Sequence, residues 1–163
     1  MKLTTVIAVL IVIAAVAAGW WWMQNGGLPS SQPAVQSAPS GGQDPYAYAP
    51  GNLLLGADST TTVGAYLIAS NAMTLYTFAR DASNTSTCTG LCAKTWPPYT
   101  IPSRDVLANV QAGINGKVDA ITRDDGSLQV TYDGQPLYFY VNDKVSGDLT
   151  GQGVGNVWFI VKP

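Results

Sequence analysis

Two residue types that often carry catalysis are missing from this chain of 163 residues. It contains no histidine, and all ten of its acidic residues are aspartates, so glutamate is absent as well. These absences remove histidine-based triads, histidine metal sites and the commonest general acids and bases. Most ordinary hydrolase mechanisms are therefore excluded, and we expect neither an enzyme nor a bound cofactor or metal.

Charge is also scarce. Charged residues make up 11% of the chain, about half the usual share, and the net charge is −2. Residues 51–163 carry seven Lys or Arg side chains against nine Asp side chains. No strong field is available to gather polyanions, so nucleic acid is not an expected partner.

Residues 1–23 are dominated by one apolar run. The segment 3–22 holds 20 residues without a charge, which as a helix rising about 1.5 Å per residue matches a hydrocarbon core of roughly 30 Å. Lys2 precedes the run and no charge follows until Asp44, so the positive-inside bias exports the downstream chain. We expect a single-pass signal-anchor, with the remainder on the extracytoplasmic side of the cell membrane.

A cleaved signal peptide is the alternative for the same segment. Ala15-Val16-Ala17 has the small-x-small pattern of a signal peptidase site, and cleavage there would leave a secreted chain beginning near Ala18. The new N-terminus would then carry three exposed tryptophans, which favours the anchor.

Residues 24–50 are expected to be a tether. Gly, Pro, Ser and Gln supply most of this segment, a composition that cannot bury enough apolar area to fold. Tyr46 and Tyr48, near its end, are expected to be solvated, and contact with the domain is the alternative. The folded domain is therefore assigned to residues 51–163.

The second half of the domain repeats the first at a fixed offset of about 62 residues. The offset aligns five pairs of identical residues: Gly64 with Gly126, Leu75 with Leu137, Tyr76 with Tyr138, Asp81 with Asp143 and Trp96 with Trp158. Because Trp and Tyr are rare, this agreement indicates a tandem pair, with copy one at about 53–102 and copy two at about 117–163.

Each copy is predicted to form a β-meander, which makes the domain all-β. In copy two, Asp-Gly turns separate strands expected at 117–123, 127–132 and 136–141, and a fourth strand at 157–161 needs burial on both faces. Copy one has the corresponding strands at 65–69, 74–79 and 96–101, with a further short strand at 53–55 and one helical turn at 105–109. We expect seven or eight strands in two related sheets that share a core, where Trp96 and Trp158 are equivalent.

The residues of both copies resemble a known family. Residues 76–81 read Tyr-Thr-Phe-Ala-Arg-Asp, residues 138–143 read Tyr-Phe-Tyr-Val-Asn-Asp, and residues 88–98 read Cys-Thr-Gly-Leu-Cys-Ala-Lys-Thr-Trp-Pro-Pro. This pattern is similar to the Tyr-x-(Phe/Trp/Tyr)-x-x-Asp, Cys-x-x-x-Cys and Trp-Pro-Pro elements of a bacterial secreted-repeat family of predicted lipoproteins. The motif residues here are Tyr76, Phe78, Asp81, Trp96, Pro97, Pro98, Tyr138, Tyr140, Asp143 and Trp158.

The resemblance implies an exported bacterial β-repeat domain and implies no activity, because none is assigned to the family. The chain departs from the lipoprotein members in one respect. Its first cysteine is Cys88, so it has no lipobox cysteine, which favours a protein anchor over lipidation.

Cys88 and Cys92 are expected to form a disulfide, because an exported domain meets oxidising conditions. Copy two has Thr150 and Val154 at the positions that the repeat offset aligns with them, within a glycine-rich segment. Two alternatives remain open for the cysteines. They are a reactive dithiol assisted by Lys94, and a Cu(I) site that also uses Met73.

Asp81 and Asp143 invite comparison with the paired carboxylates of aspartic proteases and glycosidases. An Asp that ends a strand more commonly accepts backbone N–H groups and organises the next turn, so a structural role is expected. Calcium binding near Asp143 and Asp148, or near Asp124 and Asp125, is a further alternative, although the spacing of an EF-hand loop is absent.

Alternation along the chain sends Tyr138 and Tyr140 to one face of a strand and Phe139 to the other. Such tyrosines pack on sheets or bind a glycan or protein. The sequence as a whole favours a membrane-tethered, non-catalytic envelope module whose partner is an envelope protein or glycan. The runner-up is a redox or copper-handling protein that uses Cys88 and Cys92.

Overall fold

The computed structural model describes residues 45–163, so the segment at 3–22 and most of the tether lie outside the described residues. Strands dominate, as the all-β prediction requires, and helices are few and short. Within this range we find no helical segment with the length and hydropathy of a membrane span. The elements are β1 (Leu55–Thr60), β2 (Gly64–Ala69), β3 (Tyr76–Phe78), α2 (Leu91–Thr95), β4 (Thr100–Ile101), η1 (Arg104–Ala108), β5 (Val118–Thr122), β6 (Leu128–Tyr132), β7 (Gln135–Pro136), η2 (Val154–Asn156) and β8 (Trp158–Ile160).

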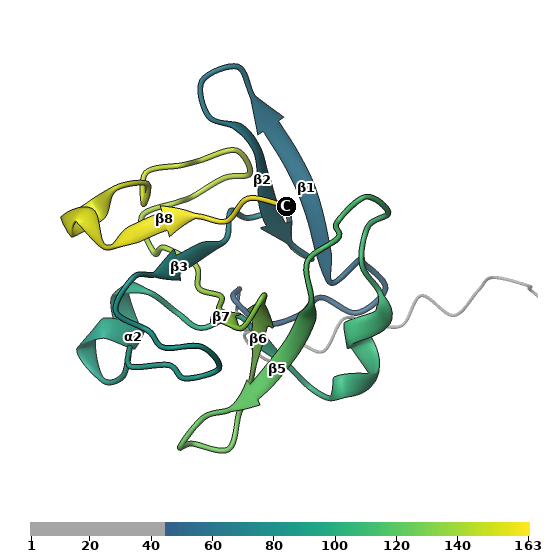
Figure 1. Cartoon of the computed structure of the whole chain (residues 1–163), viewed down its shortest axis with the longest axis vertical. Coiled ribbons are helices and arrows are strands. Elements are labelled where there is room, and N and C mark those ends of the chain that lie inside the picture. The colour runs from purple at the N-terminus through teal and green to yellow at the C-terminus, as the bar shows by residue number, and fades with distance from the viewer. Residues whose placement is uncertain (1–44) are drawn as a thin grey trace, which may run out of the picture. The chain divides into compact units, whose positions relative to one another are not determined.

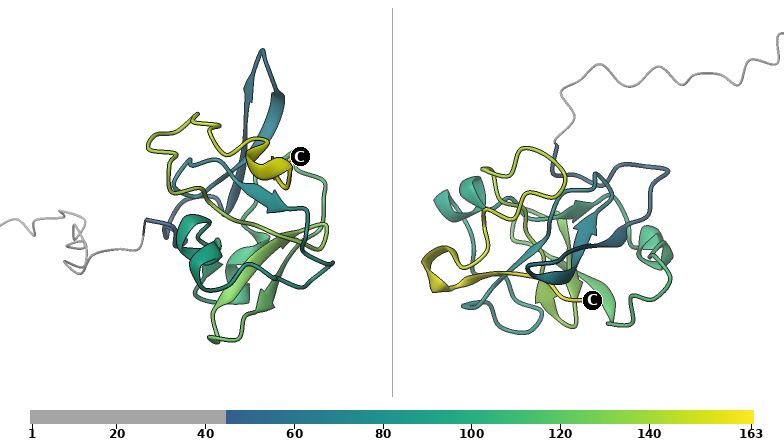
Figure 2. Two further views of the ribbon diagram at one scale, coloured as in Figure 1. Left: turned by 90° about the vertical axis from the view of Figure 1, so that its left-hand side faces the viewer. Right: turned by 90° about the horizontal axis from the view of Figure 1, so that it is seen from above.

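The described strands form three small antiparallel sheets rather than the two that the sequence indicates (Figure 1). β1 and β2 make a hairpin that extends away from the rest of the domain in Figure 1 and in the left view of Figure 2. β4, β6 and β5 pair in that order, with β7 also on β6, while β3 pairs with β8.

The predicted Asp-Gly hairpins of copy two are confirmed. Asp133 and Gly134 connect β6 to β7 with φ angles of 50° and 78°, which are the left-handed values that a two-residue hairpin turn needs. Gly126, with φ of 83°, lies in the turn between β5 and β6. These turns form where the sequence places residues that tolerate positive φ.

The two copies are intertwined, which the meander prediction did not include. The backbone N–H of Tyr76 donates to the oxygen of Tyr138, and the N–H of Tyr138 donates to the oxygen of Tyr76, both at 2.9 Å. β8 from copy two pairs with β3 of copy one, and β4 from copy one pairs with β6 of copy two. The last strand of each copy therefore completes a sheet of the other copy.

Four strand predictions need correction. The strand expected at 96–101 is reduced to β4, because α2 precedes it and Trp96 is the C-cap of that helix. The short strand expected at 53–55 begins only at Leu55 and extends to Thr60 as β1, where it pairs with β2.

The strand expected at 136–141 enters the ladder only as β7, because the chain then passes between two parts of copy one, where Tyr138 bridges to Tyr76 and Pro98. The strand expected at 157–161 is not buried on both faces. Phe159 is 40% exposed, because the two-stranded β3–β8 sheet packs on the core through one face.

Two apolar clusters form the core. The first is mainly aliphatic, with Tyr99 and Phe139 among its buried members. The second is mainly aromatic and includes Tyr76, Trp96 and Trp158 together with the disulfide-forming Cys88. Fully burying one large apolar side chain stabilises a fold by about 1.5–3 kcal/mol, so these clusters supply most of the driving force.

The folded part begins earlier than expected, at the end of the proposed tether. Tyr46 and Tyr48 are half-buried against the first cluster, and the ring of Tyr46 lies 5.2 Å from that of Phe139. The Tyr48 N–H donates to Thr100 O at 3.1 Å, and Ala47 bridges to the same residue. The expectation of solvated tyrosines was wrong, because the composition of the tether does not show that its last residues meet a groove of the domain.

Candidate functional site

The motif tyrosines and aspartates pair across the two copies. The Tyr76 hydroxyl donates to Asp143 Oδ2 at 2.7 Å, and the Tyr138 hydroxyl donates to Asp81 Oδ2 at 2.6 Å. Each tyrosine therefore binds the aspartate of the opposite copy. The equivalence that the sequence repeat indicates is a reciprocal exchange in three dimensions.

The second oxygen of each carboxylate holds a threonine. Thr87 donates both its backbone N–H and its hydroxyl to Asp81 Oδ1, at 2.7 and 2.8 Å. Thr150 does the same for Asp143 Oδ1, at 3.0 and 2.5 Å. Both oxygens of both aspartates are thus occupied by protein donors, which is the turn-organising arrangement that a structural role requires.

These contacts also raise the pKa of the tyrosines. Burial raises the pKa of Tyr76 and Tyr138 well above 10, and the hydrogen bonds to Asp143 and Asp81 raise it further. The two phenols stay protonated and act as donors at any physiological pH.

Four motif rings form one stacked column. Trp96 and Trp158 stack with centroids 3.9 Å apart and an interplanar angle of 4°. Tyr140 stacks on the outer face of Trp96 at 4.1 Å, and Phe78 stacks on Trp158 at 4.3 Å. Stacked pairs are worth about 0.5–1.5 kcal/mol beyond their buried area. These rings are engaged in packing: Phe78, Trp96 and Trp158 are buried, and Tyr140 is half-buried.

The disulfide positions one end of this column. Cys88 and Cys92 are bonded, with Cα atoms 5.2 Å apart, and Cys88 is fully buried. The bond encloses the start of α2, a helix that the sequence does not predict. The Trp96 N–H donates to Cys92 O at 2.8 Å, so the disulfide-bonded Cys92 is joined directly to the backbone of the motif tryptophan.

The structural equivalent of the disulfide loop is shifted by one residue from the sequence alignment. Thr150 makes the contacts of Thr87, not those of Cys88, so Gly151 takes the position of Cys88. A Cβ at Gly151 would lie 2.8 Å from the Tyr76 ring and 2.9 Å from the Trp96 ring. Copy two therefore needs a glycine there to admit these rings.

An arginine that the sequence analysis missed connects the loop to the sheet. Arg123 donates from Nη1 to Ser86 Oγ at 2.7 Å and to Gln129 Oε1 at 2.5 Å, and from Nη2 to Cys88 O at 2.8 Å. Ser86 Oγ in turn lies 2.7 Å from the Tyr138 hydroxyl. No sequence signal marks Arg123, since its partners come from different segments of the chain.

Arg123 also lines a pocket between the disulfide loop and the β5–β6 turn, which we call the Arg123 pocket. Its volume is about 340 Å³, within the range of small-ligand sites. The polar side chains that line it include Asn84, Thr89, Thr122, Arg123, Asp124 and Asp125.

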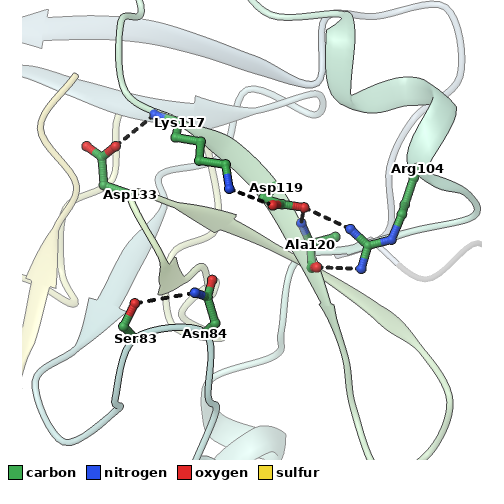
Figure 3. A network of polar contacts seen from close by, with 7 residues as sticks. All are labelled: Ser83, Asn84, Arg104, Lys117, Asp119, Ala120 and Asp133. Atoms are coloured by element: carbon green, nitrogen blue, oxygen red, sulfur yellow. Dashed lines mark hydrogen bonds and ion pairs between the residues drawn. The ribbon is translucent and has the colours of Figure 1, made fainter.

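A second polar pocket, of about 320 Å³, lies beside a network of charged side chains (Figure 3). Asp119 accepts from Arg104 at 2.8 Å and pairs with Lys117 at 3.1 Å. The Ala120 N–H and Lys117 lower the pKa of Asp119. Arg104 and Lys117 share the one carboxylate of Asp119, and Arg104 also donates to Ala120 O, so this network fixes β5 against η1.

Within residues 45–163, no group of three or more metal-binding side chains of the His, Cys, Asp and Glu types is gathered. Met73, considered above as a copper ligand, packs against the first core cluster, whereas Cys88 and Cys92 belong to the second.

The fold and its site define a class of protein: an all-β tandem repeat whose copies exchange strands and hydrogen bonds, with a disulfide in one copy. The chain belongs to the family described as a secreted repeat of unknown function, whose model matches residues 59–100 and again residues 119–162. The two matches confirm the tandem pair, and the family description agrees with a location outside the cytoplasm. The role of the individual motif residues in defining the family stays a prediction. Comparisons with curated proteins and with solved structures found no significant match.

Proposed function

We propose that this protein is a non-catalytic binding module of the cell envelope, held to the membrane by residues 3–22. The observation that carries the proposal is the state of the two motif carboxylates. All four oxygens of Asp81 and Asp143 accept hydrogen bonds from Tyr or Thr donors, so neither carboxylate is free for acid–base or nucleophilic work. The only other paired reactive groups that the sequence singled out, Cys88 and Cys92, are spent in a disulfide.

The membrane anchor at residues 3–22 is supported by the length of the apolar run and by the tryptophans at its end. If residues 3–22 anchor the chain, the full-length protein will remain in the membrane pellet after extraction at high pH. The protein will also retain the residues that precede Ala18. A mature N-terminus near Ala18, found by mass spectrometry, would show that the segment is a cleaved signal peptide.

Binding is tested by sedimentation of the purified full-length chain with bacterial cell-wall polymer and, separately, with protein-free lipid vesicles. We expect wall-dependent sedimentation that persists at high salt, because the domain has too little net charge for binding to depend on ionic attraction. A chain that stays in the supernatant with wall polymer and without it would contradict the proposal.

Counting thiols separates this proposal from a redox or copper-handling function. The material is purified from the envelope without reductant, alkylated and weighed by mass spectrometry. We expect no alkylated cysteine before reduction and two afterwards. Two alkylated cysteines in the unreduced material would favour the redox or copper function instead.

A further inference from the structure

Arg123 and the disulfide loop, which line the Arg123 pocket, have no counterpart at the equivalent positions of the other copy. The residue of copy one that the repeat offset aligns with Arg123 is Thr61, and the segment of copy two that corresponds to the disulfide loop contains no cysteine. Both copies nevertheless share the Tyr–Asp–Thr contacts that hold the fold. The arginine and the disulfide thus each occur in one copy only, and the shared contacts of the fold form in the other copy without them.

Arg123 has donors left over. A guanidinium carries five N–H groups, and Arg123 gives three of them to neutral acceptors, namely a hydroxyl, a side-chain amide and a backbone carbonyl. Its Nε is buried without a hydrogen-bond partner among the described residues. The ion pairs of residues 45–163 do not include Arg123. That Nε is closed to solvent and to a ligand in the pocket, so what Arg123 can offer a ligand is the second N–H of Nη2, which has no partner among the described residues.

The charges around the pocket indicate which ligand fits. Asp124 and Asp125 line it together with Arg123, so the carboxylates outnumber the guanidinium and a free anion is disfavoured. Asp125 is partly engaged, because its Oδ1 accepts from Ser127, whereas the Asp124 carboxylate has no hydrogen bond in the described part of the chain. The site thus offers donors and acceptors side by side.

Sugar hydroxyls match such a site, because each hydroxyl both donates and accepts. Asn84, Thr89 and Thr122 add further groups of both kinds, and Ile121 and Ala93 give an apolar wall for the C–H face of a ring. Arg123, from the end of β5, is hydrogen-bonded to Ser86, and Ser86 is hydrogen-bonded to the buried Tyr138. These bonds hold the two sides of the pocket in place, so the pocket is formed before a ligand binds.

We propose that the Arg123 pocket binds one neutral sugar unit of an envelope glycan, with Arg123 donating to a ring or hydroxyl oxygen and Asp124 accepting from sugar hydroxyls. The inference rests on the proposed function and gives it a site and a ligand class.

The test is a titration of the isotope-labelled full-length chain, in a detergent without a sugar headgroup, followed by amide NMR. The neutral probes are maltotriose and chitotriose, and the charged probes are trigalacturonate and the chitosan trimer. With at least one neutral probe, we expect saturable shifts that centre on the amides of Thr89, Gly90 and Arg123.

Two variants at equivalent positions make the test specific. Asp124→Ala removes the exposed acceptor of the pocket and should weaken binding about tenfold, the loss expected for one charge-assisted hydrogen bond. Thr62→Ala, at the position of copy one that the repeat offset aligns with Asp124, should leave the affinity unchanged. Both positions are exposed, so both variants should fold.

Other outcomes overturn the inference without touching the proposed function. Shifts centred elsewhere, with equal affinity for both variants, would reject this pocket. Binding of the charged probes alone would reject the neutral class. If no probe binds while the chain still sediments with wall polymer, the sugar site is wrong and the envelope-binding proposal stands. If sedimentation fails as well, both fall.

Discussion

Asp81 and Asp143 make the same three contacts but differ in their surroundings. Asp143 is 4% exposed, whereas Asp81 is only half-buried. A donor that loses its acceptor near Asp81 can turn to water, and one near Asp143 cannot. Asp143 should therefore contribute more than Asp81 to the free energy of unfolding.

Replacing these aspartates with asparagine tests that difference. An amide NH₂ faces donors where a carboxylate oxygen accepted, so Asp143→Asn should lower the free energy of unfolding by about 1–3 kcal/mol. Asp81→Asn should cost less, on the order of 1 kcal/mol. Chemical denaturation measures both, with Asp124→Asn as the exposed control that should change little. Loss of a hydrolytic activity with stability unchanged would show that the carboxylates are catalytic.

The buried tyrosines predict a limit at alkaline pH. Burial raises the pKa of Tyr99 to about 12, and the pKa of Tyr76 and Tyr138 is also raised by burial and by their aspartate partners. Unfolded tyrosine has a pKa of about 10. Because the folded values lie above it, the stabilisation is complete below about pH 10 and is lost as pH rises towards the folded values.

A spectrophotometric titration of tyrosinate, run alongside circular dichroism, checks this expectation. Of the eight tyrosines in the chain, Tyr76, Tyr99 and Tyr138 should ionise only as the fold is lost. Urea-unfolded protein provides the reference. If all eight ionised near pH 10 with the fold intact, the described burial of these phenols would be wrong.

The disulfide loop and α2 should behave as one unit. Removing the bond with Cys88→Ser and Cys92→Ser should cost about 2 kcal/mol, a value at the low end because the closed loop is short. A short closed loop, taken by itself, would confine the effect to the loop. The stacking of Trp96 on Trp158 instead predicts that both indoles change their near-ultraviolet circular dichroism. Trp158→Phe in the same background is the control, and an unchanged spectrum would contradict the coupling.

The sequence predicts those elements whose cause is local. Asp133-Gly134 forms its hairpin because these two residues tolerate positive φ, and the η1 turn at Arg104–Ala108 begins at Ser103, whose hydroxyl accepts from the Asp105 N–H. The exchange of β4 and β8 could not be predicted, because an offset between copies identifies equivalent strands without naming their partners. The role of Arg123 could not be predicted from the sequence for a similar reason. Its role depends on three acceptors that only the tertiary fold brings together.

Neither copy is complete without the other. β3 lacks its partner without β8, β4 lacks its partner without β6, and each motif tyrosine loses its aspartate. Small sheets of two or three strands, separated from each other, have too little buried area for independent stability. The domain should therefore unfold and fold as a single cooperative unit.

Dividing the domain after Gly113 tests this cooperativity. Fragments 45–113 and 114–163 should each give the narrow amide spectrum of an unfolded chain, and an equimolar mixture should recover the dispersed spectrum of the intact domain. The uncut domain under the same conditions is the control. A single fragment that folds as a monomer would show that the exchange is not needed for stability.

The exchange of β8 has a consequence for how the protein leaves the cytoplasm. The segment Trp158–Ile160 is synthesised after all of copy one, and β3 in copy one has no strand partner until it is available. Copy one cannot close while copy two is still on the ribosome or inside the export channel. The order of the strands along the chain therefore delays the folding of copy one until β8 has emerged.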